Sequence, residues 1–184
     1  MRSRRRNRGR EIARRWRATG PNARLAVGIA IVVLSWWVGL DTVVLAGIVV
    51  PWPIALLVAA MGWARVGLSM RPMLALVALS LLYDLGYNAP IGSYMIAALV
   101  TYGIQSAAES ALDLDYDPLM QGALPFISLF AGILVLWVLA SGSAGHLARV
   151  TPLLLSGVVT ALAFSVLSPV FHLRRRPGAL AGRT

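Results

Sequence analysis

The chain has 184 residues, of which 58% are hydrophobic and 13% are charged, and its mean hydropathy is +0.74. This charge content is far below the roughly 25% of ordinary soluble domains, so the composition indicates an integral membrane protein. The sequence contains no cysteine, which excludes a disulfide framework and any Cys-based zinc or redox site.

The net charge of +10 is concentrated near the two ends of the chain. Residues 1–24 carry ten of the seventeen Arg residues, and residues 172–184 carry four. Basic segments stay on the cytoplasmic side of a membrane, so we predict cytoplasmic tails at residues 1–24 and 174–184. An N-terminal tail that sets topology and binds anionic lipids is the favoured interpretation over nucleic-acid binding. The proposed anchor residues are Arg4, Arg5, Arg6, Arg14, Arg15, Arg174, Arg175 and Arg176.

Six apolar runs between residues 25 and 173 are candidate membrane-spanning helices, because a span needs about 20 apolar residues. Pro51 and Pro53 interrupt the second run, so that helix is either kinked or preceded by a separate short segment. We predict an all-α, six-span transmembrane bundle with short loops, placed in a cytoplasmic membrane with both termini in the cytoplasm. The runs cover residues 25–40, 43–63, 72–85, 91–107, 120–140 and 150–173.

Asp84 is the most informative residue, since it places a carboxylate at the end of the third apolar run. A charge near the bilayer centre costs about 2.5–3.5 kcal/mol, so such residues usually face protein or a solvated cavity. Asn88, Pro90 and Gly92 follow it and favour a tight turn into the fourth run. The carboxylate is either a cation or proton site, a partner contact, a group held by nearby donors, or an acid in interfacial water.

Other polar residues give weaker predictions. Gln105 and Glu109 share one helical face, where they either contact a partner, cap the bundle or, as we expect, emerge with the helix into solvent. Asp113, Asp115 and Asp117 alternate but lack the Gly and final Glu of a calcium loop. His146 and His172 lie on opposite membrane sides in the predicted topology. No catalytic constellation is found, so we predict neither enzymatic activity nor a cofactor or metal site.

The third and fourth runs resemble a known family. Residues 81–92 read Leu-Leu-Tyr-Asp-Leu, three intervening residues, and then Ala-Pro-Ile-Gly. This element is similar to the Leu-Leu-x-Asp-Leu stretch and Pro-hydrophobic-Gly turn of the bacterial rod shape-determining protein MreD family. The resemblance covers residues 53–105, and Tyr83 departs from it by standing where an aliphatic residue is expected. The matching positions are Leu82, Asp84, Leu85, Pro90, Ile91 and Gly92.

The resemblance implies a non-enzymatic scaffold of the cell-wall elongation machinery, required for rod cell shape. Such a protein would bind an MreC-like membrane protein. It would indirectly support MreB filaments and the pair formed by RodA and a penicillin-binding protein. Asp84, Asn88, Pro90, Gly92, Gln105 and Glu109 are then candidates for structural or partner-contact roles.

An alternative is a substrate-binding membrane subunit that resembles the S components of energy-coupling-factor vitamin transporters. In that case Ala26 and Ala30 would form a docking face on the first helix. A pocket near the outer surface would be lined by Asp84, Tyr87, Asn88 and Tyr94.

Overall fold

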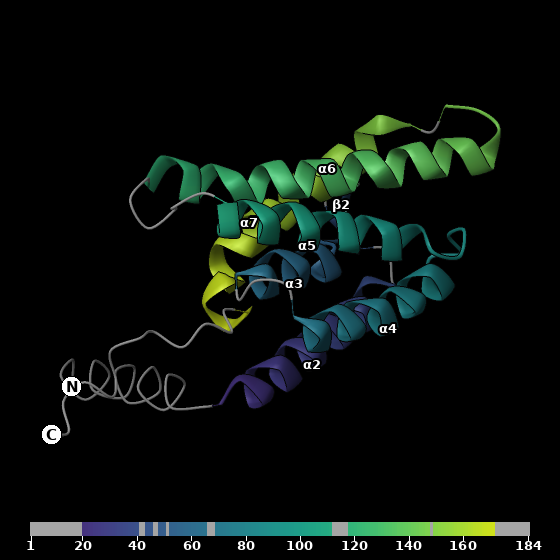
Figure 1. Ribbon diagram of the computed structural model, residues 1–184. Helices are drawn as coiled ribbons and strands as arrows, with labels where there is room; N and C mark the ends of the chain where they lie inside the picture. The colour runs from purple at the N-terminus through teal and green to yellow at the C-terminus, as the bar shows by residue number, and fades with distance from the viewer. Residues whose placement is uncertain are drawn as a thin grey trace, which may run out of the picture.

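The computed structural model describes residues 20–40, 43–45, 48–50, 52–65, 69–111, 118–147 and 149–171. These residues form six helices and one two-stranded hairpin (Figure 1). All the predicted anchor arginines lie outside the described residues, as do Asp113, Asp115, Asp117 and His172. The elements in order are α2 (Pro21–Gly39), β1 (Val43–Leu45), β2 (Ile48–Val50), α3 (Ala55–Ala64), α4 (Met70–Gly86), α5 (Ser93–Ala111), α6 (Pro118–Ala144) and α7 (Val150–Phe171).

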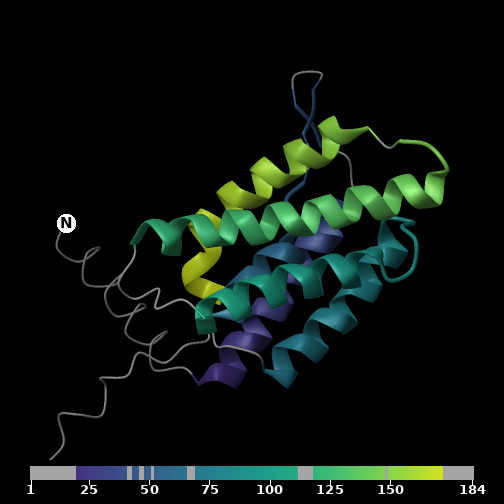
Figure 2. The same cartoon turned by 45° about the horizontal axis from the view of Figure 1, so that its top comes forward.

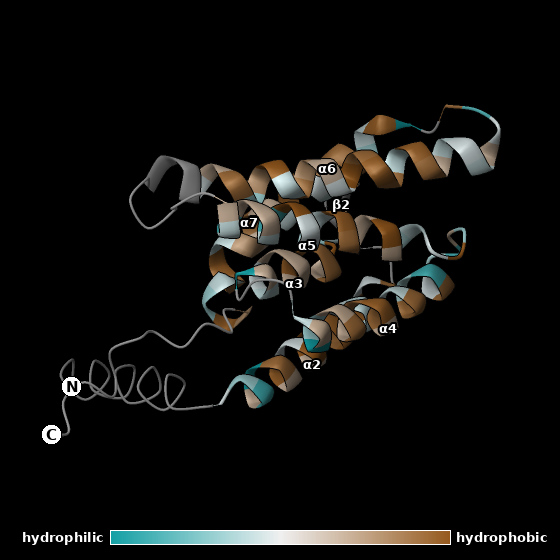
Figure 3. Ribbon diagram, viewed as in Figure 1, coloured by the Kyte–Doolittle hydropathy of each residue, from teal (hydrophilic) through white to brown (hydrophobic). Residues whose placement is uncertain are grey.

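Three of the helices are long and apolar enough to cross a membrane, which confirms the prediction of a multi-pass helical membrane protein. They are α2 with 19 residues, the stretch Gly122–Ala144 of α6 with 23, and α7 with 22. Apolar residues cover most of the ribbon, and hydrophilic ones gather at the start of α2 and near the turn after α4 (Figure 3). The other three helices are α3 with ten residues, α4 with 17, and the more polar α5 with 19.

The prediction of one helix across residues 43–63 is wrong in its first half. Val43–Leu45 and Ile48–Val50 instead pair as antiparallel strands, with Val43 opposite Val50 and Leu45 opposite Ile48. β-Branched side chains lose rotamer freedom in a helix and suit a strand, and five of these six residues are β-branched. Gly47 between the strands favours a turn, and Pro51 after them has no amide to continue a helix.

The second half of that run becomes α3, which forms the centre of the molecule. All ten of its residues are buried. A helix that is apolar on every side is stable when other helices surround it, and α3 contacts α2, α4, α5, α6 and α7. At 1.5 Å per residue its length is about 15 Å, half of a typical hydrocarbon core, so α3 covers only part of the length of the bundle.

The helices alternate in direction, which brings the start of α2 to the end of α7. Near that end of the bundle, Gly28 of α2 lies against Trp63 of α3 and Phe171 of α7. The two rings pack with their centroids 6.2 Å apart. At the opposite end, Gly39 of α2 lies against Trp52 and against Tyr87, which follows α4.

Candidate functional site

The turn between α4 and α5 holds the sequence motif, and backbone chemistry ends α4 there. The amide of Tyr87 donates to the Tyr83 carbonyl at 3.0 Å, and the amide of Ala89 donates to the Asp84 carbonyl at 3.0 Å. Asn88 between them has a φ of 49°, in the left-handed region that Asn tolerates better than most residues. This arrangement is the usual helix ending with a left-handed residue, so Asn88 terminates α4.

The Asp84 side chain then crosses the turn and holds the start of α5. Its Oδ2 accepts from the amide of Gly92 at 2.7 Å, and its Oδ1 accepts from the amide of Tyr94 at 3.0 Å. The residue is only 2% exposed. The first amides of a helix have no partner within the helix and carry partial positive charge, so a carboxylate is favourable at this position.

Gly92 is required at this turn by its backbone conformation. Its φ is +94°, which side-chain-bearing residues rarely adopt. A lack of space for a side chain does not explain this glycine. A Cβ atom added to Gly92 would lie 3.9 Å from Cε of Met95, which is an ordinary van der Waals contact. Pro90 precedes it and accepts a hydrogen bond from the amide of Ser93 at 3.0 Å, which closes the turn.

Three tyrosine rings gather beside this carboxylate. The centroids of Tyr83 and Tyr94 are 5.4 Å apart, those of Tyr83 and Tyr87 5.7 Å, and those of Tyr87 and Tyr94 5.9 Å. The hydroxyl of Tyr83 is buried beside the first backbone amides of α3. Partial burial raises the pKa of the Tyr87 hydroxyl above its usual value. The cluster packs α4 against α5 next to the buried Asp84.

A second polar group lies near the other end of α5. Gln105 is fully buried: its Nε2 donates to Oε1 of Glu109 at 3.2 Å, and its Oε1 accepts from the Ser128 hydroxyl of α6 at 3.2 Å. Glu109 faces Arg65, which follows α3, with 3.8 Å between Oε1 and Nε. The expectation that Gln105 emerges into solvent is therefore wrong, because α6 covers this face of α5.

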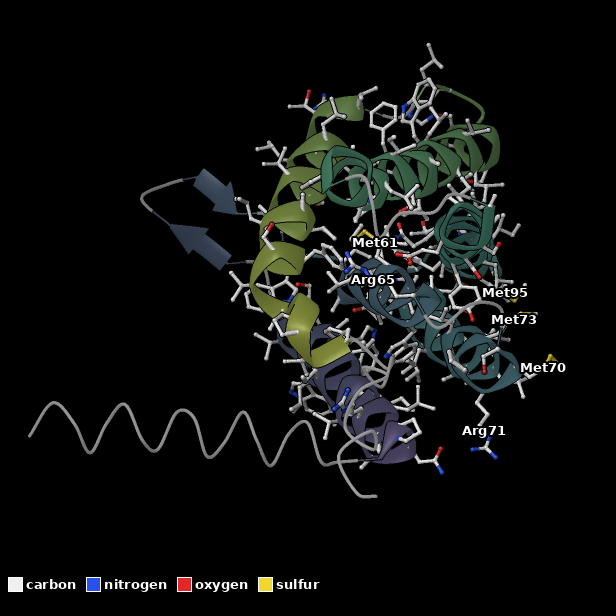
Figure 4. The ribbon with its side chains drawn as sticks, turned by 60° about the vertical axis from the view of Figure 1, so that its left-hand side comes forward. Met61, Arg65, Met70, Arg71, Met73 and Met95 are labelled. Atoms are coloured by element: carbon white, nitrogen blue, oxygen red, sulfur yellow. The ribbon has the colours of Figure 1, made fainter. Side chains whose placement is uncertain are left out.

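Arg65, which follows α3, and Arg71, in the first turn of α4, have different surroundings. The Arg65 side chain is only 20% exposed and lies close to the Phe164 ring, with Cζ 5.9 Å from its centroid. Figure 4 shows Arg65 inside the bundle near Met61, whereas Arg71 points away from it. Arg71 donates to Oδ1 of Asn22 at 3.0 Å, which joins the starts of α4 and α2.

Two contacts between helices were not predicted. Thr160 of α7 accepts a hydrogen bond at 2.9 Å from the amide of Ile54, which precedes α3. Gly132 of α6 lies directly against Thr101 of α5, where a larger residue would collide with the threonine hydroxyl. The spacing of Thr101 and Gln105 by four residues on an apolar helix is a signal that could have indicated this buried face.

Two hollows are described on the surface, and neither is lined by Asp84, Tyr87, Asn88 or Tyr94. A hollow of 420 Å³ lies between Pro90–Ser93 and the end of α6. An apolar hollow of 190 Å³ lies between α6 and α7, with Phe130 and Trp137 in its lining. His146 is exposed, and no group of three or more potential metal-ligating side chains occurs among the described residues.

The Asp84 turn is therefore built to join two helices, because both carboxylate oxygens are bound by backbone amides of the following helix. Comparisons of this chain with protein-family models, with curated proteins and with solved structures each gave no match.

Proposed function

We propose that this protein is a non-enzymatic membrane scaffold of the bacterial cell-wall elongation machinery, required for rod shape and binding an MreC-like partner. The observation that carries the proposal is the structural role of the Asp84 carboxylate. Its two oxygens accept hydrogen bonds from the Gly92 and Tyr94 amides. The residues that resemble the MreD motif thus form a rigid helical hairpin, and a scaffold needs a fixed shape more than a reactive group.

The proposal includes the cell's inner membrane as the location and a cytoplasmic position for both termini. The contact of Gly28 with Trp63 and Phe171 supports this orientation, because it brings the first half of α2 and the end of α7 together. Arg65 and Arg71 belong to that same end, as expected for a cytoplasmic face. In this arrangement MreB filaments, RodA and a penicillin-binding protein are indirect partners.

The vitamin-transporter alternative needs a polar pocket at the Asp84 turn. The hollow at this turn is lined by Pro90–Ser93 and the end of α6 and not by the side chains of the predicted pocket, and the Asp84 carboxylate is already bound by the chain's own amides. No observation favours this alternative, and we do not carry it further.

The test is a depletion strain complemented with variants of this chain. Wild-type protein and the exposed control Ser165→Ala should restore rod shape and co-purify a single-span, MreC-like protein. Asp84→Ala should lose both activities, because the α4–α5 hairpin loosens. Depleted cells that stay rod-shaped, together with wild-type purifications that contain no such partner, would refute the proposed function.

A further inference from the structure

Arg71 places a positive charge where the starts of α2 and α4 meet. It lies in the first turn of α4, and its Nη1 donates to Oδ1 of Asn22 in the first turn of α2, at 3.0 Å. The two helix starts lie side by side at one end of the bundle (Figure 2). With 19 residues α2 is about 28 Å long, which matches a hydrocarbon core of about 30 Å. Its first turn, and Arg71 with it, therefore lies near one surface of the membrane.

No acidic side chain of the described residues neutralises Arg71. Asn22 is uncharged, and the first turns of α2 and α4 contain no acidic residue. The two carboxylates that the structure describes are used elsewhere: Asp84 binds amides at the other end of α4, and Glu109 faces Arg65. A cation in the first turn of a helix also meets the positive end of the helix dipole. An anion beside Arg71 would therefore be favourable.

The Arg71 guanidinium is accessible to such an anion. The residue is exposed and points away from the bundle (Figure 4). A guanidinium carries five N–H donors, and the hydrogen bond to Asn22 uses one of them. The planar arrangement of these donors matches the oxygens of a phosphate group, which a guanidinium can bind through two parallel hydrogen bonds.

Exposed apolar side chains continue from this charge along α4. The helix packs against α2, α3 and α5, and its remaining face carries large apolar residues at helical spacing. Met70 is 69% exposed, Leu74 63%, Leu81 44% and Leu85 70%. Within a bilayer this face meets lipid chains. A phosphate that carries acyl chains therefore fits both the charge and the apolar face, whereas inorganic phosphate fits only the charge.

We propose that Arg71, positioned by Asn22, binds the phosphate of an anionic phospholipid whose acyl chains lie along the exposed face of α4. An anionic lipid is favoured over a zwitterionic one, because the second headgroup charge of a zwitterionic lipid is itself a cation and leaves Arg71 less well neutralised. The site belongs to the folded bundle and is distinct from the arginines of the two tails. It is also independent of the elongation-machinery proposal.

The natural absence of cysteine allows a test at one position of the full-length chain. Leu74→Cys is labelled with the fluorophore bimane and placed in vesicles of phosphatidylglycerol and phosphatidylcholine in equal amounts. Bromine atoms, which quench the label, are carried by the chains of one lipid or of the other. Bromine on phosphatidylglycerol should quench severalfold more strongly than bromine on phosphatidylcholine. The control is Leu162→Cys on α7, which is also 63% exposed and should show a much smaller ratio.

Substitutions of arginine then assign the lipid preference to one side chain. In the labelled Leu74→Cys chain, Arg71→Gln should lower the quenching ratio to the value at Leu162→Cys. Arg71→Lys keeps the charge and should retain most of the preference, which separates loss of charge from loss of folding. Arg149→Gln removes the same charge from an exposed position before α7 and should leave the ratio unchanged.

Three results would overturn the inference. The first is an equal quenching ratio at Leu74→Cys and Leu162→Cys. The second is a ratio that survives Arg71→Gln, which would assign the lipid preference to other arginines. The third is an equal loss in Arg149→Gln, which would show that the preference follows the net charge of the chain.

Discussion

Replacing Asp84 by alanine should be among the most damaging substitutions in the chain. The change leaves the amides of Gly92 and Tyr94 without their acceptors. A hydrogen bond to a charged group contributes about 1.5–3 kcal/mol, so losing both lowers the free energy of unfolding by about 3–6 kcal/mol. The α4–α5 connection then loses the contact that fixes its angle.

The matched variant is Asp84→Asn, which keeps the shape of the side chain and one acceptor oxygen. One hydrogen bond is lost and the other becomes a weaker bond to a neutral amide oxygen, so the expected loss is about 2.5–4.5 kcal/mol, below that of alanine. Ser165→Ala is the surface control, because its exposed hydroxyl bonds only to the carbonyl of Ala161 in its own helix.

The assay is thermal unfolding in lipid nanodiscs, followed by tryptophan fluorescence. For a chain of this length about 1 kcal/mol shifts the melting temperature by roughly 2–4 °C, so Asp84→Ala should melt about 6–24 °C below the wild type. Hydrogen exchange should accelerate at the amides of Gly92 and Tyr94. Unchanged melting and unchanged exchange at these two amides would refute the role assigned to the carboxylate.

Three further substitutions test the contacts between helices by the same melting assay. Gly132→Ala should destabilise the protein by about 1–3 kcal/mol, because its methyl group collides with α5. Gly103→Ala should stabilise the protein by about 0.4–1 kcal/mol, because the space beside Gly103 is open. A Gly132→Ala variant that melts above Gly103→Ala would contradict this packing. Gln105→Leu should cost about 1–3 kcal/mol by removing the two hydrogen bonds that the buried amide makes to Glu109 and Ser128. An unchanged melting temperature would contradict this. Thr160→Val keeps the side-chain shape but removes the acceptor for the amide that begins α3, at a cost of about 1–3 kcal/mol; a melting temperature equal to that of Ser165→Ala would contradict it.

Most helices could be predicted from the sequence, because a long apolar run in a membrane protein satisfies its backbone by forming a helix. The third run, predicted at 72–85, is the helix Met70–Gly86, and the sixth, predicted at 150–173, is Val150–Phe171. The turn residues Asn88 and Gly92 could also be predicted, since both positions need a backbone conformation that few other residues tolerate.

The second run could not be predicted by hydropathy alone. Residues 43–50 and 55–64 are both strongly apolar, and this property does not distinguish a strand from a buried helix. Gln105 was misplaced for a related reason: its position near a helix end suggests solvent, but α6 covers it and supplies the hydroxyl of Ser128. Neither outcome is encoded in the local sequence pattern.

The sequence by itself determined that this is a multi-pass helical membrane protein, because its composition and apolar runs leave few alternatives. It also indicated that Asp84 needs a special environment, since a carboxylate beside an apolar run is costly. Only the tertiary structure decided what that environment is. The left-handed turn at Asn88 folds α5 back onto α4, and this brings two helix-start amides, eight and ten residues away, to the two oxygens of Asp84.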